Sequence, residues 1–296
     1  MLTHLVITAD DFGLAVDVNI AVEMAHRNGI LSAASLMVGA PAADDAVRRA
    51  RTLPRLAVGL HVVLVDGAPT LPPDDIPDLL DKRGLLRNDL AKLGLDIAVR
   101  PKVHSQLRKE IRAQFEAFAA SGLALSHVDV HKHYHLHPIV AADIISIGRE
   151  FGIRSVRVPY EPRRILKSID KQDIRSCSML APLVALLKWQ AHCAGLLTAD
   201  AVFGWSWSGA LNEMRMVGLV SQARPEGLTE IYCHPAISDD FEGHAPGYGY
   251  RGELEALLST KVAMALNASG FRLSNYERAL RRETQDDSLC PDAEAK

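Results

Sequence analysis

The feature of this chain that most constrains its fold is the alternation of short apolar runs with amphipathic segments. Runs that read as strands occur at 4–8, 32–39, 56–65, 123–131, 155–159, 201–207 and 228–234. Segments with helical spacing lie between several of them, at 16–28, 41–51, 104–121 and 139–151. The segment 104–121 is the clearest helix, because its apolar residues recur every three or four positions. Strand–helix repeats of this kind predict a parallel sheet covered by helices.

Chain length and motif content favour a barrel over other parallel sheets. The 296 residues suit one α/β barrel, which takes about 250 residues. The sequence contains no GxGxxG or GxxxxGK[ST] phosphate loop and no GxSxG nucleophile elbow. We therefore expect a distorted (β/α) TIM-like barrel, a single domain over 1–281. The long segment 66–103 is expected to shape a site or carry short helices, and 282–296 is expected to be a disordered tail.

Polar residues interrupt the apolar strands near their carboxyl ends. They are Asp10 and Asp11 after the first strand, His61 in the third, Asp129 and His131 at the end of the fourth, and His234 after the last. In a barrel these strand ends open on one face, which carries catalysis. Each residue also has a structural interpretation, as a helix cap or a hydrogen-bonded core histidine. Four separate intrusions at equivalent places favour one shared site.

The residue types at these strand ends are those of a metal site. Two or three imidazoles with one carboxylate bind a divalent ion and leave positions open for water. Of two adjacent aspartates, one can bind the ion while the other accepts the proton of the water, and a histidine can protonate a leaving amine. The pattern therefore predicts metal-assisted hydrolysis with one divalent ion, with Mg²⁺ and Zn²⁺ as the first candidates.

Four motifs resemble, in order and spacing, those of the YdjC-like carbohydrate deacetylases: TADDFG, GLHVVLV, HVDVHKHYHLHP and CHP. The resemblance runs from about residue 3 to about residue 276. It implies a distorted (β/α) barrel that removes N-acetyl groups from amino sugars with a divalent metal ion. By the same resemblance, Asp11, His61 and His131 bind the metal, Asp10 is the general base and His234 is the general acid.

A second metal set follows from the more distant NodB-type deacetylases, which use an H-x3-H motif. His127 and His131 have that spacing, so the alternative set is Asp11, His127 and His131. An i, i+4 pair converges only on a helix or a sharp turn. Because His127 begins an extended segment, His61 is the preferred ligand.

The remaining histidines of the run 127–137 are expected to line the cleft. In an extended run, alternate residues from 131 to 137 share a face. Only His131 then needs to bind metal, and His133 and His135 are expected to contact the sugar. Arg157 is likewise expected to bind substrate. Asp129 is expected to orient a metal ligand through a hydrogen bond.

Three stretches resemble the branch of this family that is associated with hopanoid biosynthesis. They are residues 8–51, HKHYHLHP and VRVPYEP. The branch implies deacetylation of an N-acetylglucosaminyl bacteriohopanetetrol, a glycolipid, to the free amino sugar. Two alternatives remain open: a deacetylase of soluble chitooligosaccharides, and a barrel that binds sugar or metal without catalysis.

The segment 161–199 joins a basic stretch to an apolar, helix-like stretch. Leu180, Leu183, Val184, Leu187 and Trp189 lie in or near one helical stripe. A basic stretch beside such a helix can lie on an anionic membrane surface. The alternative is an ordinary helix of the outer ring of the barrel. Peripheral membrane contact is the interpretation that a glycolipid substrate favours.

Composition bears on partners and compartment. A net charge of −3 and a pI near 6.5 give no electrostatic reason to expect nucleic acid. The four cysteines form no CxxC pair, which is typical of reduced thiols in a cytoplasmic protein. The N-terminus lacks the long apolar stretch of a secretory signal. We expect a cytoplasmic protein, peripheral at the inner membrane face if it uses the glycolipid, and a homodimer.

Overall fold

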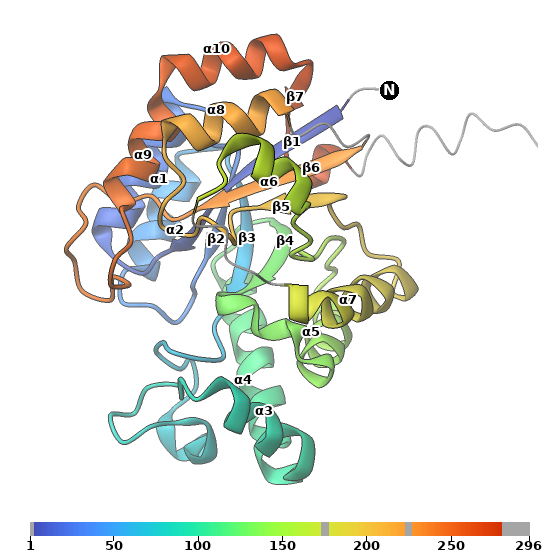
Figure 1. Ribbon diagram of the computed structural model, residues 1–296. Helices are drawn as coiled ribbons and strands as arrows, with labels where there is room; N and C mark the ends of the chain where they lie inside the picture. The colour runs from blue at the N-terminus through green and yellow to red at the C-terminus, as the bar shows by residue number, and fades with distance from the viewer. Residues whose placement is uncertain (1–2, 173–177, 223–226, 280–296) are drawn as a thin grey trace, which may run out of the picture.

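The computed structural model describes residues 3–172, 178–222 and 227–279, and its centre is a curled parallel sheet (Figure 1). Its seven strands are β1 (Thr3–Phe12), β2 (Ala33–Leu36), β3 (Ala57–Val62), β4 (Leu125–Val130), β5 (Ala201–Phe203), β6 (Leu228–Cys233) and β7 (Phe271–Leu273). The order is β4-β3-β2-β1-β6-β5, with β7 beside the start of β1. This confirms the predicted α/β class and the distorted, barrel-like sheet.

The segment 155–160 connects the two edges of the sheet, β4 and β5. Arg157 N donates to Val128 O at 2.9 Å, and Val202 N donates to Tyr160 O at 2.8 Å. The sequence predicted a regular strand over 155–159, but the structure has only isolated bridges at Ser155 and Val156. Pro159 and Pro162 lack the N–H groups that a continued strand would donate. The sheet is therefore closed on this side by irregular chain.

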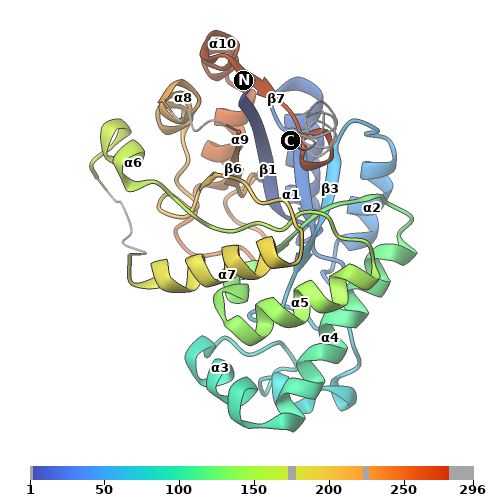
Figure 2. The same cartoon turned by 90° about the vertical axis from the view of Figure 1, so that its right-hand side faces the viewer.

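Helices cover the outer surface of the sheet (Figure 2). They are α1 (Val16–Asn28), α2 (Ala43–Arg51), α3 (Leu90–Val99), α4 (Pro101–Ala120), α5 (Pro138–Glu150), α6 (Arg163–Ile169), α7 (Ala181–Cys193), α8 (Glu213–Gln222), α9 (Tyr250–Leu258) and α10 (Thr260–Ser269). The helices predicted at 16–28, 41–51, 104–121 and 139–151 correspond to α1, α2, α4 and α5. The expected tail, 282–296, lies outside the described residues.

The long segment 66–103 carries short helices, as expected. It contains two 3-10 turns, η1 (Pro73–Asp75) and η2 (Pro77–Leu79), and then α3 and the start of α4. The buried carboxylate of Glu110 on α4 accepts hydrogen bonds from the backbone of Thr70 and Leu71. Through Asp66, Gly67 and Ala68, this segment contributes one wall of the cleft described below.

The apolar stripe of α7 belongs to the protein core. Val184 and Leu187 are buried in the main hydrophobic cluster, and Leu183 packs against that cluster. The helix lies on α5 in both views (Figures 1 and 2). The leucines of this stripe are therefore core residues and not a membrane-facing surface, whereas Trp189 is exposed. Peripheral membrane contact of 161–199 stays a prediction. Among the described residues, no helix is long and apolar enough to cross a membrane.

This placement predicts unequal effects of two substitutions on one helix. We expect Leu187→Ala to lower the free energy of unfolding by about 2–4 kcal/mol, because it opens a cavity under α7. Trp189→Ala is the control, since Trp189 is 60% exposed and its loss should change stability by less than about 0.5 kcal/mol. Thermal or urea denaturation measures both. Equal losses would show that α7 is not packed as described.

Candidate metal and active site

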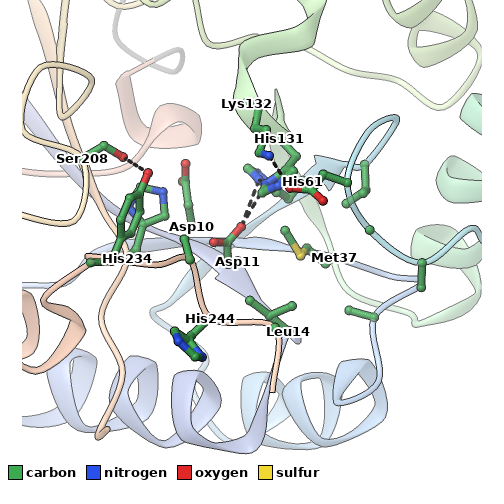
Figure 3. Close-up of a pocket in the computed structure, with 18 of the residues that line it drawn as sticks. Asp10, Asp11, Leu14, Met37, His61, His131, Lys132, Ser208, His234 and His244 are labelled. Atoms are coloured by element: carbon green, nitrogen blue, oxygen red, sulfur yellow. Dashed lines mark hydrogen bonds and ion pairs between the residues drawn. The ribbon is translucent and has the colours of Figure 1, made fainter. Parts of the chain in front are cut away.

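The two adjacent aspartates lie where β1 leaves the sheet. Neighbouring residues of a regular strand point to opposite faces. Here the pairing register with β2 shifts between Ala9 and Phe12, and Asp11 has a left-handed backbone with φ 60°. This break in the alternation lets Asp10 and Asp11 both line the same cleft (Figure 3). Aspartate adopts left-handed φ more readily than most residues, which suits this position.

Three atoms that could bind a metal ion lie close together, one each from Asp11, His61 and His131. These residues come from three separate elements. Asp11 Oδ1 lies 3.4 Å from His61 Nε2 and 3.3 Å from His131 Nδ1, and the two imidazole nitrogens are 3.3 Å apart. His61 comes from β3, and His131 follows β4 directly. The strand register pairs His61 with Asp129 on β4, which brings the two strand ends level.

This triangle has the dimensions of a metal donor set. Donors about 2.0–2.2 Å from a tetrahedral ion lie about 3.3–3.6 Å from one another. Asp11 Oδ1 is buried and has no hydrogen-bond partner among the described residues. Burial alone would raise the pKa of Asp11. The imidazoles of His131 and His61 outweigh burial and lower this pKa well below its ordinary value. Asp11, His61 and His131 therefore fit a divalent ion, with further positions open to the cleft.

Asp129 fixes the orientation of His61. The His61 Nδ1–H donates to Asp129 Oδ1 at 2.8 Å, which leaves Nε2 facing the donor triangle. Burial disfavours the imidazolium, but the carboxylates of Asp129 and Asp11 raise the pKa of His61 to about 10. Asp129 is thus placed to orient the His61 ring, and its role behind a metal ligand stays a prediction.

Arg157 holds Asp10, the first aspartate of the pair, in place. Its guanidinium donates to both oxygens of Asp10, at 2.6 and 2.8 Å, and contacts Asp129 Oδ2 at 2.7 Å. It also donates to both oxygens of Glu230 on β6, at 2.8 and 3.1 Å. We call Arg157 with Asp10, Asp129 and Glu230 the ion cluster. A planar guanidinium forms such paired hydrogen bonds in one fixed geometry.

The charge balance of this region favours a bound cation. Among the described residues, three buried carboxylates, those of Asp10, Asp129 and Glu230, contact the guanidinium of Arg157, and a fourth, that of Asp11, lies beside His61 and His131. Buried charges are stable only when they are paired. Burial, which outweighs the attraction of Arg157, raises the pKa of Asp10 to about 6. A carboxylate with a pKa near neutrality can accept a proton and release it again during turnover.

His234 approaches the cleft from the end of β6. In Figure 3 it lies on one side of the aspartate pair, and His61 and His131 lie on the other. Its backbone N–H donates to the buried carboxylate of Glu253 on α9 at 2.5 Å, and its Nδ1 lies 3.9 Å from the same carboxylate. Its ring packs edge-on against Tyr248. The imidazole is therefore fixed at the edge of the cleft.

The histidine run differs from the extended segment that the sequence suggested. Residues His131–Leu136 form a 3-10 segment, η3, in which Lys132 and His133 have left-handed backbones with φ 53° and 52°. His133 lines the cleft, and its Nε2 is 2.8 Å from Tyr232 Oη. Burial lowers the pKa of His133 well below its ordinary value, so this ring is neutral at pH 7.

Two residues expected to contact substrate are buried behind the cleft. Arg157 has no exposed surface, because its guanidinium is enclosed by the ion cluster and by the ring of Tyr232. His135 is also buried, and its Nε2 lies 2.8 Å from Arg157 O. The prediction that these two side chains contact the sugar directly is therefore corrected. They lie behind the cleft, where His135 contacts the backbone of Arg157 and Arg157 holds Asp10.

His127 lies outside the donor triangle. Its Nε2 is 3.0 Å from Ser35 Oγ on β2, and its ring stacks on Tyr276. A Cβ on Gly59 would come within 2.5 Å of this ring, so glycine is required there for the imidazole to pack under β3. The structure thus brings together Asp11, His61 and His131 and places His127 one layer below them.

Several residues of this region were not predicted from the sequence. Glu230 accepts hydrogen bonds from Thr8 and Tyr276 in addition to Arg157. Ser35 donates to Asp129 Oδ2 at 2.8 Å. Glu230 and Ser35 interrupt apolar strands just as His61 does, so the same criterion applied to 32–39 and 228–234 would have found them. Tyr276 stands in no such pattern.

The cleft itself has a volume of about 670 Å³. It is lined by the two aspartates, His61, His131, His133 and His234, by aromatic residues Trp205, Tyr232, Tyr248 and Tyr250, and by the loops around 66–68 and 242–246. Cavities of this size hold small organic ligands. A curled parallel α/β sheet with a candidate metal donor set and a further carboxylate at its carboxyl edge defines the class of α/β barrels whose catalytic face lies at the carboxyl ends of the strands.

Comparison with known proteins identifies the family within that class. The family model described as YdjC-like protein matches residues 4–268, so the chain belongs to the YdjC-like family. A carbohydrate deacetylase of Brevibacillus brevis is 30% identical over 236 residues, 80% of this chain and 82% of that protein. A chitooligosaccharide deacetylase of Yersinia enterocolitica is 29% identical, covering 92% of this chain and 97% of its own.

A solved structure supports the fold. The crystal structure of a putative cellobiose-phosphate cleavage protein from Enterococcus faecalis superposes with a TM-score of 0.72 at 24% identity. The match covers 94% of this chain and 99% of the other. At this level of identity the likeness concerns the architecture of the two chains.

Proposed function

We propose that this protein is a hydrolase that removes N-acetyl groups from amino sugars with the help of one divalent metal ion. The observation that carries the proposal is the Asp11–His61–His131 donor triangle directly beside Asp10, a carboxylate outside the triangle, in one cleft. The names of the relatives, carbohydrate deacetylase and chitooligosaccharide deacetylase, point to the same reaction. A divalent cation held by the triangle would polarise the amide carbonyl and acidify the attacking water.

The remaining chemistry falls to residues of this chain. Asp10, whose pKa is about 6, is suited to accept the proton of the attacking water. Arg157 keeps both carboxylate oxygens of Asp10 in one orientation, so that little reorganisation is needed during the reaction. His234 is suited to donate a proton to the leaving amine, and Glu253 positions its backbone. Tyr232, Tyr248 and His133 offer aromatic surface against which a sugar ring can pack.

For the natural substrate we propose the N-acetylglucosaminyl hopanoid, on the strength of the three stretches that resemble that branch. A soluble chitooligosaccharide is the second candidate, and the printed name of the Yersinia relative favours it. Both present an N-acetylated glucosamine, so the cleft described here serves either. They differ only in what is attached to the sugar.

The proposal is tested by incubating the purified protein separately with diacetylchitobiose and with an N-acetylglucosaminyl hopanoid. We expect mass spectrometry to show loss of one acetyl group, and acetate to be released in equal amount. Dialysis against a chelator should stop the reaction, and added Zn²⁺ or Mg²⁺ should restore it. Absence of deacetylation on both substrates, with metal present, would favour a barrel that only binds its ligand. Full turnover by metal-free protein would contradict the role of the ion.

A further inference from the structure

A second cavity adjoins the candidate active-site cleft and shares one wall with it. The cavity has a volume of about 450 Å³ and lies between the segment 159–163 and the first turns of α7. Trp205, which follows β5, lines both this cavity and the main cleft. A ligand that reaches past Trp205 would therefore have one part in each.

The shared wall is held rigidly. The carboxylate of Glu161 accepts hydrogen bonds from the backbone N–H groups of Gly204 and Ser206, both at 3.0 Å, on either side of Trp205. Gly204 has φ 135°, and a Cβ there would lie 2.4 Å from Tyr232 O. The Trp205 ring also lies 4.9 Å, centroid to centroid, from His133 in the main cleft. The Glu161 hydrogen bonds therefore hold the backbone around Trp205, and His133 packs against its indole.

The chemistry of the second cavity differs from that of the main cleft. Its walls include Pro159, the half-exposed ring of Tyr160, Val184, Ala185 and Trp205, which are apolar or aromatic. Among the described residues, the carboxylate that lines it is Glu161, which accepts hydrogen bonds from backbone N–H groups and from Ser206 Oγ. A sugar hydroxyl would find few partners here, whereas a hydrocarbon group would be removed from water.

We infer that this cavity, which we call the aglycone cavity, binds the hydrocarbon aglycone of a glycoside whose N-acetylated sugar lies in the main cleft. The inference rests on the proposed function for the position of the sugar. The cationic side chains that line the cavity among the described residues, Arg163 and Lys188, are both exposed and lie towards solvent.

Two substrates with the same sugar test the aglycone cavity: methyl and octyl N-acetyl-β-glucosaminide, the latter below its micelle-forming concentration. Each methylene group removed from water contributes up to about fourfold in affinity. We expect kcat/KM to be at least about 10-fold higher for the octyl glycoside, mainly through a lower KM. Equal kcat/KM values for the two glycosides would overturn the inference.

Two variants on α7 test whether the preference for the octyl glycoside arises at the aglycone cavity. Ala185 is exposed and lines the aglycone cavity, so Ala185→Glu should abolish the octyl preference without disturbing the core and leave turnover of the methyl glycoside unchanged. His192→Glu is the control, because His192 is exposed on the same helix but does not line the cavity, and it should keep the preference. Retention of the full octyl preference in Ala185→Glu would place the alkyl chain elsewhere and overturn the inference.

A binding measurement separates this inference from the proposed function. Octyl β-glucoside carries no acetyl group, and calorimetry measures its binding without any reaction. Binding to the wild type that is lost in Ala185→Glu supports the aglycone cavity, whatever the turnover. Absence of such binding overturns it. Failure of the wild type to deacetylate either glycoside would instead count against the proposed function.

Discussion

Replacement of Asp10 by asparagine is expected to lower kcat by about 10²–10⁴-fold while the protein still folds and binds metal. The amide oxygen of asparagine can accept one of the two hydrogen bonds that Arg157 donates to Asp10, so part of this contact is kept. It cannot take the proton of the attacking water at neutral pH. Initial rates of acetate release from diacetylchitobiose measure the effect.

A matched control for this change is Asp44→Asn, which removes an exposed carboxylate on α2 outside the main cleft and should leave kcat unchanged. Metal content and circular dichroism of Asp10→Asn show whether the loss is confined to chemistry. Turnover within a few fold of the wild type would end the assignment of Asp10 as general base. Loss of metal together with turnover would instead make Asp10 a ligand.

Removal of the His61 imidazole is expected to lower metal affinity by more than about 100-fold and to abolish turnover. Groups that only orient a ligand typically contribute about 10–100-fold to metal affinity. Asp129→Asn should fall in that lower range, because Asp129 acts on the metal through His61. Elemental analysis after equilibrium dialysis against limiting Zn²⁺ measures both variants.

The control is His127→Ala, a second buried histidine, one strand away from His61. It should lower stability, because its ring fills the space under Gly59 and against Tyr276, but it should keep full metal occupancy. If His127→Ala loses the ion and His61→Ala keeps it, the ligand set is Asp11, His127 and His131. This comparison therefore decides between the two sets that the sequence leaves open.

The parts of the fold that could be predicted are those in which local pattern and burial agree. β1, β3 and β6 are mostly apolar runs with a few polar interruptions, and α1 and α4 have clear helical spacing with glycine after the end of each predicted segment. The strand predicted at 155–159 is wrong for a local reason, since Pro159 and, just beyond it, Pro162 lack the N–H groups that a continued strand would donate. The environment of the α7 stripe could not be decided from the sequence, because an apolar helical face has the same pattern whether it packs against lipid or against α5.

The candidate site could be predicted as a set of strand ends but not as a geometry. That Asp10 and Asp11 lie near His61 and His131 follows from a parallel sheet, in which carboxyl ends meet at one edge. The left-handed backbone of His133 and the burial of Arg157 do not follow, because both depend on contacts between residues far apart in sequence. Arg157 is 147 positions from Asp10 and 73 from Glu230. The sequence suggested that Arg157 contacts substrate. In the structure it is instead enclosed by three buried carboxylates.

The bulge at the end of β1 has a consequence for how this scaffold can change. Because the suggested base and the suggested ligand are consecutive residues, their Cα atoms are held about 3.8 Å apart by a single peptide unit. Their spacing cannot be altered by the lengths of the surrounding loops. The walls around 66–68 and 242–246 can therefore acquire insertions or new side chains, and so admit other sugars, while the distance between proton acceptor and cation stays constant. A single inserted residue between positions 10 and 11 would separate the two roles.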